Sequence, residues 1–370
     1  MIRILHFVHG LAKSGGLSNC VMNYYRNIDR SKIQFDFVYF RECESDFKEE
    51  IAQMGGRYFK LTEPSFNFSY YKEGKSFFES HHGEWAAIHC HALFAAFFYA
   101  DIARKQGVKN VIAHAHSTVY GKGLLRSLRN YIIIRGTRIK ANHYVACGEK
   151  AGRFLFGDSN FENGKVTIFN NAVDCKRSKY SEEKRRILRE DLSLGDAFVV
   201  GHVGGFSIVK NHTYLLDIFK IIKQMHPNSK MLFIGGAGIA SGSTREQVKE
   251  KTSHLGLKDD VLFLGVRNDI GDLLSVMDAY VLPSQFEGLP LSLVEAQVNG
   301  LPCYVSDVVT REASIGLCTF LSIQDEPEKW AKQILNFQIV NRERGTDLAK
   351  KAGFDISSEA QKLASFYYKM

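Results

Sequence analysis

Proline and long hydrophobic runs are scarce in this sequence. Six of its 370 residues are prolines, 45% of the residues are hydrophobic and 24% are charged. This composition excludes a disordered chain, a collagen and a small disulfide-stabilised domain. The longest apolar run, 92–100, is far shorter than the ~20 residues that cross a bilayer. The length suits two domains, each able to bury its own core.

The sequence also has no C-x-x-C pair of cysteines, and its first residues are not expected to be a secretory signal. The seven cysteines form no C-x-x-C pair, their number is odd, and most lie in apolar, strand-like runs. This pattern is typical of a reduced cytosolic protein. The first ten residues are interrupted by Arg3, His6 and His9, unlike a secretory signal. We therefore expect a cytoplasmic protein, with peripheral contact at the inner face of the cell membrane as an additional hypothesis.

Acidic residues are sparse in the first half of the chain. Residues 1–180 hold 26 lysines and arginines against 16 acidic residues, whereas residues 181–370 hold 22 against 24. An anionic partner is therefore expected to meet the first half. Nucleic acid is not the expected partner, because the sequence shows no motif for its recognition.

Segment 122–140 contains no acidic residue at all. Basic and apolar side chains interleave along it, as in an amphipathic element that lies on an anionic membrane. A core helix with a solvated basic face and a phosphate-binding face are the alternatives. The basic residues of this predicted face are Lys122, Arg126, Arg129, Arg135 and Arg138.

Short apolar runs alternate with amphipathic segments along the chain, which predicts βαβ units and parallel sheets covered on both faces. The alternation stops at a polar stretch, 171–183, and then restarts. We therefore predict an α/β protein with two doubly wound, Rossmann-like domains facing a cleft, and ligands at the carboxyl ends of the strands. The predicted strands lie at 4–10, 35–40, 86–91, 110–116, 143–148, 165–169, 197–206, 230–236, 261–265, 279–283 and 302–306.

The most informative stretch is 284–300, SQFEGLPLSLVEAQVNG. It follows a predicted strand and leads into a helix that begins at Pro290 or Leu291, where a missing proline N–H costs nothing. The free N–H groups of Gly288, Leu289 and Leu291 form an anion site at this helix start, and Gly288 lets a ligand approach the backbone.

Two carboxylates, Glu287 and Glu295, flank that anion site and suit the hydroxyls of a sugar or ribose. From spacing alone, a binding role for both residues is no better supported than the alternative, in which Glu287 is an ordinary loop residue and Glu295 an ordinary exposed helix residue. Lys210 follows another predicted strand and opens a helix, which suits a diphosphate. A solvated lysine is the commoner interpretation of such a position.

The run E-G-L-P-L-S-L-V-E-A resembles the E-x7-E motif of retaining glycosyltransferases of the GT-B fold, specifically family 4, and among them the bacterial exopolysaccharide and capsule enzymes. The similarity extends over nearly the whole chain. It includes SGGLSNCVMN, AHAHST, HYVACGEKAGRFLFG, VTIFNNAVD and VVGHVGGFSIVKN. The resemblance implies an acceptor-binding domain over 1–175, a nucleotide-sugar-binding domain over 176–350, and a C-terminal helix in 351–370 that crosses back to the first domain.

The resemblance also implies roles for single residues. Glu287 would hold the donor sugar, Glu295 the ribose diol and Lys210 the diphosphate, while His116 would lie near the reacting centre. The backbone residues implied at the sugar and diphosphate are Gly288, Leu289, Pro290 and Leu291. The residues implied beside the base are Gly265, Val266 and Arg267, and those of the diphosphate and acceptor loop are Gly15 and Gly16.

One position departs from the family pattern. Gly205 stands where many members have an arginine that pairs with the diphosphate, and its loss removes a two-pronged donor. Lys210 alone or Arg267 are the expected substitutes. An active enzyme with weaker donor affinity and a non-catalytic partner subunit are the two interpretations.

A metal or cofactor is not expected. His89, His91, His114 and His116 form two H-x-H pairs at strand ends, but no further ligand spacing completes a site. The glycines at 235–238 lack the complete dinucleotide-binding pattern. The resemblance implies that a helix N-terminus and cations replace Mg²⁺ in supporting the departing diphosphate.

The expected activity is transfer of a sugar, with retention of configuration, from a nucleotide donor to a growing glycan or lipid-linked saccharide. UDP is the expected nucleotide. A sugar-nucleotide epimerase of the same shape and a non-catalytic subunit are the alternatives.

Overall fold

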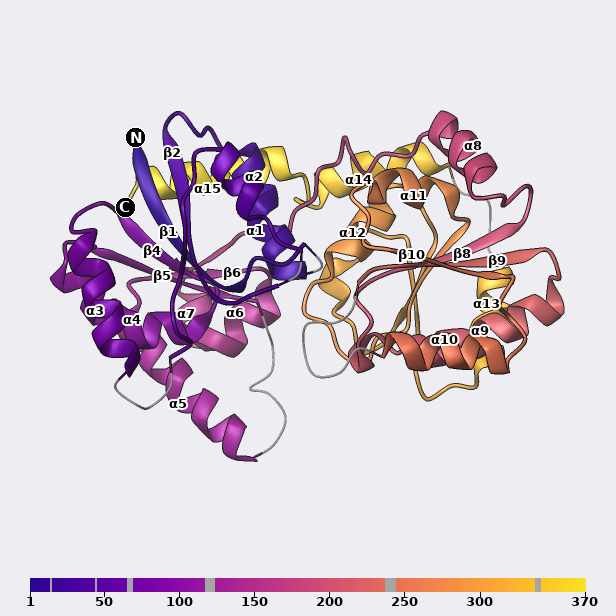
Figure 1. The fold of residues 1–370 in the computed structure, drawn as a ribbon, viewed down its shortest axis with the longest axis horizontal. Coiled ribbons are helices and arrows are strands. Elements are labelled where there is room, and N and C mark those ends of the chain that lie inside the picture. The colour runs from indigo at the N-terminus through magenta and orange to yellow at the C-terminus, as the bar shows by residue number, and fades with distance from the viewer. Residues whose placement is uncertain (14, 44, 65–68, 117–123, 237–243, 337–340) are drawn as a thin grey trace. The chain divides into compact units, whose positions relative to one another are not determined.

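The structure, a computed structural model, describes residues 1–13, 15–43, 45–64, 69–116, 124–236, 244–336 and 341–370. The chain divides into two compact units (Figure 1). Unit 1 comprises Met1–Asn170 together with Ser357–Met370, and unit 2 comprises Asn171–Ile356. Among the described residues, no helix has the length and apolar character needed to cross a membrane.

Unit 1 is built on a seven-stranded parallel sheet of order β3-β2-β1-β4-β5-β6-β7. Figure 1 shows α1, α2 and α15 on one face of this sheet and α3, α4 and α5 on the other. The strands are β1 Ile2–Gly10, β2 Ile33–Arg41, β3 Tyr58–Lys60, β4 Ala87–Cys90, β5 Asn110–Ala115, β6 His143–Ala146 and β7 Val166–Ile168. The helices are α1 Gly16–Asn27, α2 Lys48–Gln53, α3 Ser69–Ser80, α4 Leu93–Lys105, α5 Leu124–Lys140, α6 Glu149–Phe156, α7 Asp158–Glu162 and α15 Ile356–Tyr368.

Unit 2 is built on a six-stranded parallel sheet of order β10-β9-β8-β11-β12-β13. The strands are β8 Phe198–Val203, β9 Ser229–Ile234, β10 Val261–Gly265, β11 Ala279–Leu282, β12 Cys303–Ser306 and β13 Cys318–Leu321. The helices are α8 Glu182–Asp191, α9 His212–Met225, α10 Arg245–His254, α11 Ile270–Val276, α12 Leu291–Val298, α13 Pro327–Leu335 and α14 Gly345–Lys351, with short 3-10 turns η1 Ile208–Lys210, η2 Arg311–Ala313 and η3 Arg342–Arg344. One of its cores packs α9 and Trp330 of α13 against the sheet.

The two sheets share one topology. Counting from the first strand of each unit, both follow the order 3-2-1-4-5-6, and unit 1 adds a seventh strand. This is the doubly wound order, in which all strands run parallel but successive strands are added in opposite directions along the sheet from strand 1 and from strand 4, which leaves a crevice at the carboxyl ends of these two strands. The reversal lies between β1 and β4 in unit 1 and between β8 and β11 in unit 2. The fold therefore directs attention to the segments that follow these four strands.

The C-terminal helix α15 belongs to unit 1 from Ser357 onward. Its Tyr367 hydroxyl lies 2.6 Å from Nδ1 of His89 in β4, and the backbone N–H of Asn170 donates to its Glu359 carboxylate at 3.0 Å. Tyr367 and Glu359 are both buried. The last helix thus contributes polar groups to the interior of unit 1.

Candidate functional site

The segments after β8 and β11 are bonded to each other. Lys210, the last residue of η1, donates from Nζ to Oε1 of Glu287 at 2.6 Å, and the two side chains are only 19% and 14% exposed. The backbone N–H of Gln285 also donates to the carbonyl of Val209 at 2.7 Å. A Cβ on Gly204 would lie 3.1 Å from Cε of Lys210, so this glycine leaves room for the lysine chain. The two predicted donor-binding residues therefore form one charged pair.

A serine that sequence reasoning missed supports the Glu287 carboxylate. Ser284 is fully buried directly after β11, and its hydroxyl donates to Oε1 of Glu287 at 2.8 Å. The hydroxyl of Ser306, at the end of β12, donates to the carbonyl of Ser284 at 2.5 Å. The signal in the sequence was a hydroxyl residue between a strand and the first glutamate of the motif. The carboxylate is thereby held by a cation and a neutral donor at once.

Helix α12 starts directly beyond this carboxylate. Its N-cap is Pro290, which has no side-chain cap hydrogen bond, and the first helical residue is Leu291. The side chains of Leu289 and Leu291 are buried, so these positions offer a ligand their backbone. The first N–H groups of a helix lack partners within the helix and favour an anion.

Glu295 lies one turn further along α12 and is half-buried. Burial raises the pKa of its carboxyl to about 7, an effect that the nearby Arg177 opposes. At neutral pH the group is therefore divided between a carboxylate that accepts hydrogen bonds and an acid that donates one. Either form suits a vicinal diol, which both donates and accepts.

Strand β10 ends at a glycine in the left-handed conformation, and an exposed valine follows it. Gly265 has φ 68°, and Val266 is 47% exposed. Arg267 binds Asp269 in a two-pronged ion pair, with Nε to Oδ1 at 2.8 Å and Nη2 to Oδ2 at 2.5 Å. Its guanidinium is thus committed to a neighbour in its own loop, which argues against the expectation that Arg267 replaces an arginine at Gly205.

In unit 1, Gly15 is the N-cap of α1 and Gly16 is its first residue. The side-chain amide of Asn19 donates to the carbonyls of Gly15 at 2.9 Å and Lys13 at 2.7 Å. Among the described residues, apart from the adjoining backbone, no atom lies within 4 Å of the position that a Cβ on Gly16 would take. The start of α1 is therefore a braced turn with open space beside it.

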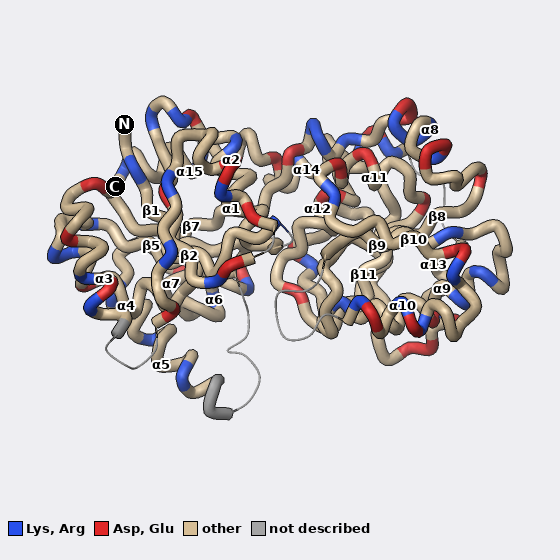
Figure 2. Tube along the Cα trace, viewed as in Figure 1, with Lys and Arg blue, Asp and Glu red and all other residues tan. Residues whose placement is uncertain are grey.

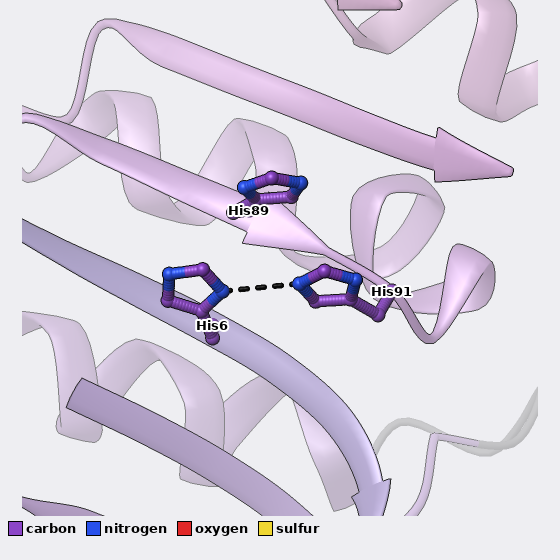
Figure 3. Close-up of side chains that lie close together, drawn as sticks. All are labelled: His6, His89 and His91. Atoms are coloured by element: carbon purple, nitrogen blue, oxygen red, sulfur yellow. Dashed lines mark hydrogen bonds between the residues drawn. The ribbon is translucent and has the colours of Figure 1, made fainter. Parts of the chain in front are cut away.

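Histidine rings from β1, β4, β5 and the residues directly after β4 and β5 form a stack, in which His116 is half-buried and the others are buried. Figure 3 shows His6, His89 and His91, the first of which sequence reasoning missed. His6 pairs in register with His89 across β1 and β4, which brings it to the H-x-H pairs. Nδ1 of His6 lies 3.0 Å from Nε2 of His91, and Nδ1 of His91 lies 2.9 Å from Nε2 of His116. Nε2 of His89 lies 3.0 Å from Nδ1 of His114.

All five rings are neutral at physiological pH. Burial lowers the pKa of His116 to about 3, with a smaller contribution from His9. Burial is also the main cause that holds the pKa values of the other four well below 6.5: His6, His89, His91 and His114. The stack is therefore a set of hydrogen-bonded neutral imidazoles.

Two groups within the stack have the spacing of metal ligands, His6 with His89 and His91, and His91 with His114 and His116. In both groups, however, ring nitrogens bond to one another, and the rings stack, as with His89 and His91 at 4.4 Å and 12°. Lone pairs in the planes of stacked rings do not converge on one point. The arrangement therefore fits a hydrogen-bonded stack better than the tetrahedral coordination of a metal ion.

The predicted basic face falls partly on helix α5, along which Lys and Arg occur without Asp or Glu (Figure 2). Arg129 and Arg135 are exposed. Arg138 is not part of that face: its guanidinium donates to the carbonyls of Phe154, at 3.1 Å, and Leu155 at the end of α6. Lys122 lies outside the described residues, and the Arg126 side chain is not among the described groups.

Large apolar side chains are exposed on the same helix. Leu128 is 55% exposed and Ile139 is 79% exposed, and Tyr131 and Ile132 lie between them at 45% and 48%. Spacings of three, four and seven residues place these side chains along one side of the helix. The exposed side of α5 therefore combines apolar and basic groups.

Comparison with known proteins agrees with this architecture. Residues 14–177 match the model of Glycosyltransferase Family 4, and residues 183–343 match that of Glycosyl transferases group 1. The putative glycosyltransferase EpsF of Bacillus subtilis is 33% identical over 377 residues, covering 99% of this chain and 96% of the relative. The capsular polysaccharide biosynthesis glycosyltransferase CapH of Staphylococcus aureus is 23% identical, with 99% of both chains covered.

Among solved structures, Anabaena HepE in complex with UDP and glucose superposes with a TM-score of 0.80 at 20% identity, and both chains are covered completely. That likeness shows the GT-B fold, two Rossmann-like domains in one chain. Together with the near full-length relative from Bacillus subtilis, it leads to one conclusion. The chain belongs to the glycosyltransferase family that the group 1 and family 4 models describe, and it is a glycosyltransferase of the GT-B fold.

Proposed function

We propose that this glycosyltransferase moves a sugar from a UDP-linked donor to a growing glycan or lipid-linked saccharide in surface polysaccharide synthesis, with retention of anomeric configuration. The observation that carries the proposal is the Lys210–Glu287 pair at the start of α12, with Glu295 on the same helix. The role of CapH in capsular polysaccharide biosynthesis supports the proposed pathway class, and the UDP bound to HepE supports the proposed nucleotide.

Each donor part has a matching group in unit 2. The diphosphate meets the Lys210 ammonium and the N–H groups that open α12. Glu287 accepts hydrogen bonds from the transferred sugar, and Glu295 binds the ribose diol. The backbone of Gly265 and Val266 borders the base.

In the proposed transfer step, the Lys210 ammonium and the N–H groups that open α12 act on the leaving diphosphate. The bond between the anomeric carbon and the diphosphate oxygen breaks, and the acceptor hydroxyl forms its bond to the same face of that carbon. A phosphate oxygen takes the proton of the acceptor, and the positive groups at the diphosphate stabilise the charge that develops on it. His116 takes part at the sugar, and Gly15 and Gly16 line the path of the diphosphate and acceptor.

We further propose that unit 1 touches an anionic membrane through α5. One side of this helix exposes apolar side chains, with Arg129 and Arg135 beside them. Helices of this composition insert their apolar side at the boundary between lipid headgroups and acyl chains. A lipid-linked acceptor would be reached from that position. This contact is separable from catalysis, because it involves none of the proposed donor-binding residues.

The test is a panel of UDP-, GDP-, ADP- and TDP-sugars screened for protection against thermal unfolding, followed by transfer assays with the protecting donor. Ligand at 100 times its Kd stabilises the folded state by ~2.7 kcal/mol. We expect a UDP-sugar to protect and the product linkage, read by NMR, to keep the donor's configuration. Protection by no nucleotide sugar, or an inverted product, would contradict the proposal. Protection without transfer to any acceptor would favour the non-catalytic subunit.

A further inference from the structure

The loop between Glu287 and helix α12 is fastened by a side chain from the beginning of unit 2. The amide of Asn171 donates from Nδ2 to the carbonyl oxygen of Leu289 at 2.9 Å. A carbonyl can only accept a hydrogen bond, so the NH2 group of the amide must be the part that faces it. Asn171 and Leu289 are only 9% and 8% exposed. The bond is therefore shielded from water, and removing the donor would leave a buried carbonyl unsatisfied.

The proline that follows Leu289 makes this bond more important than an ordinary loop contact. Pro290 has no N–H, so the carbonyl is the only hydrogen-bonding group of the peptide unit that joins the two residues. Pro290 is also the N-cap of α12, and its own carbonyl accepts from the N–H groups of Leu293 at 3.2 Å and Val294 at 3.4 Å. Asn171 thus fastens the chain at the residue directly before the N-cap, next to the N–H groups that open the helix.

The bond between Asn171 and Leu289 uses no group that the proposed function assigns to the donor. The Lys210 ammonium and the Glu287 carboxylate bond each other at 2.6 Å, and a donor that meets both groups competes with this bond. The beginning of the loop is held by its backbone, where the N–H of Gln285 donates to the carbonyl of Val209 at 2.7 Å. The end of the loop is held by Asn171. This second anchor can therefore persist when a donor enters.

Asn171 also stands where the chain passes between the units. It is the first residue of unit 2, and Ile356 is the last. The N–H of Val173 donates to the carbonyl of Phe354 at 2.9 Å, and the N–H of Ile356 donates to the carbonyl of Val173 at 3.0 Å. Val173, Phe354 and Ile356 are at most 3% exposed. The two connecting segments are therefore paired within unit 2, two residues from the side chain that holds the donor loop.

We propose that Asn171 is a positioning residue for the donor diphosphate. Through the Leu289 carbonyl it fixes the start of α12, and it couples that start to the paired segments that connect the units. The role rests on the function proposed above, because the diphosphate is the ligand that the start of α12 would meet. Asn171 acts through the backbone: it holds N–H groups in place before the ligand arrives, so that binding does not have to order them.

The first experiment measures amide hydrogen exchange of the free full chain at single residues by NMR, for Asn171→Ala and the unsubstituted protein. We expect the N–H groups of Leu293 and Val294 to exchange about five-fold faster in the variant, the factor that one hydrogen bond of ~1 kcal/mol supplies. Exchange in α9 should stay constant. Unchanged exchange at the start of α12 would overturn the anchor. Equally faster exchange throughout unit 2 would mean a general loss of stability and would overturn the positioning role.

The second experiment measures UDP binding by calorimetry. We expect the Kd for UDP to rise about five-fold in Asn171→Ala. Asn171→Asp, which keeps the size of the side chain and removes the NH2 donor, should give a loss in the same direction if the alanine variant folds poorly. Asn160→Ala is the matched control, because Asn160 donates one bond of 2.9 Å to the carbonyl of Phe156 in unit 1. Equal UDP affinity in the unsubstituted protein and both Asn171 variants would overturn the role at the diphosphate.

Hydrogen exchange in the presence of UDP tests the coupling to the connecting segments. We expect UDP to slow exchange of the Val173 and Ile356 N–H groups in the unsubstituted protein and to slow it less in Asn171→Ala. Slowing that is equal in both proteins, or absent from both, would overturn the coupling. If UDP does not bind the unsubstituted protein, the proposed function fails and the role at the diphosphate fails with it. Exchange of the free protein would still show whether Asn171 holds the start of α12.

Discussion

The two units place different chemistry at the same point of the same topology. At the reversal between β1 and β4, unit 1 carries His6, His89 and His91, whose rings are buried and neutral. At the reversal between β8 and β11, unit 2 carries the Lys210–Glu287 ion pair, which keeps some contact with solvent. Burial explains the difference, because charged groups that lose water must be paired whereas imidazoles can lose their charge. The same fold can thus carry neutral imidazole rings in one unit and a charged pair in the other. We call the Lys210–Glu287 ion pair the clamp.

The largest effect should come from breaking the clamp. We expect Glu287→Ala to lower kcat by about 10²–10³-fold, the range for losing one preorganised polar group at a reacting centre. UDP affinity should stay constant or increase, because Lys210 is released from its carboxylate partner. Calorimetry with UDP and initial rates with the donor sugar measure the two effects.

Lys210→Ala and His116→Ala supply the contrasts to that change. Lys210→Ala should weaken UDP binding, and His116→Ala should lower kcat with little change in UDP affinity. If Glu287→Ala instead weakens UDP binding as much as it lowers the rate, the carboxylate supports the fold or the nucleotide and not the transferred sugar.

The Glu295 carboxylate should lower the free energy of unfolding above neutral pH while it contributes to nucleotide binding. Its folded pKa of about 7 exceeds the ordinary 4.5, so the stability that its proton contributes is complete below pH 4.5 and lost as the pH rises through 7. We expect Glu295→Gln to raise the free energy of unfolding at pH 8 by roughly 1–3 kcal/mol. Urea melts at pH 5 and pH 8 measure this, and the gain should vanish at the lower pH.

The same position should matter for the nucleotide. Glu295→Ala is expected to weaken UDP and donor binding alike by about 1.5–3 kcal/mol, since both ligands share the ribose. The 2′-deoxy nucleotide is the matched ligand control and should lose less affinity than UDP on substitution. Unchanged UDP affinity would remove the ribose assignment.

Gly205→Arg tests whether the clamp is incomplete. With Lys210 paired to Glu287 and Arg267 paired to Asp269, an arginine at 205 would add a guanidinium fork to the diphosphate. We expect UDP to bind about 1–3 kcal/mol more tightly and transfer to accelerate. Calorimetry showing equal or weaker binding would contradict the view that the diphosphate lacks a cation at this position.

The smallest effect should come from α5. Substituting Arg129 and Arg135 by Gln should weaken binding to anionic vesicles by about 1 kcal/mol per arginine, and binding should fall as salt rises. Arg138→Gln is the matched control: it removes the same charge from a side chain that bonds α6 carbonyls, so stability should fall more than vesicle binding. Vesicle binding that ignores salt, or that falls equally in all variants, would contradict this contact.

Most helices and strands could be predicted because the run or period of apolar residues that marks each of them lies within the element itself. Apolar runs placed β8 and β11, and the helix at 212–225 follows from its periodicity. The short strands β3 and β13 were missed, because three or four partly exposed residues carry no period of their own and pair only once a neighbouring strand exists.

Sequence by itself determined the family, the two βαβ series and the motif around Glu287 and Glu295, since these depend on residue type and spacing. Tertiary structure alone decided which groups meet. Lys210 reaches Glu287 across 77 positions of the chain, Arg138 turns to the end of α6, and Tyr367 lies against His89 from a helix 278 positions away. No spacing rule encodes such contacts, because parallel strands are joined by long connections and become neighbours only when the sheet closes over its core.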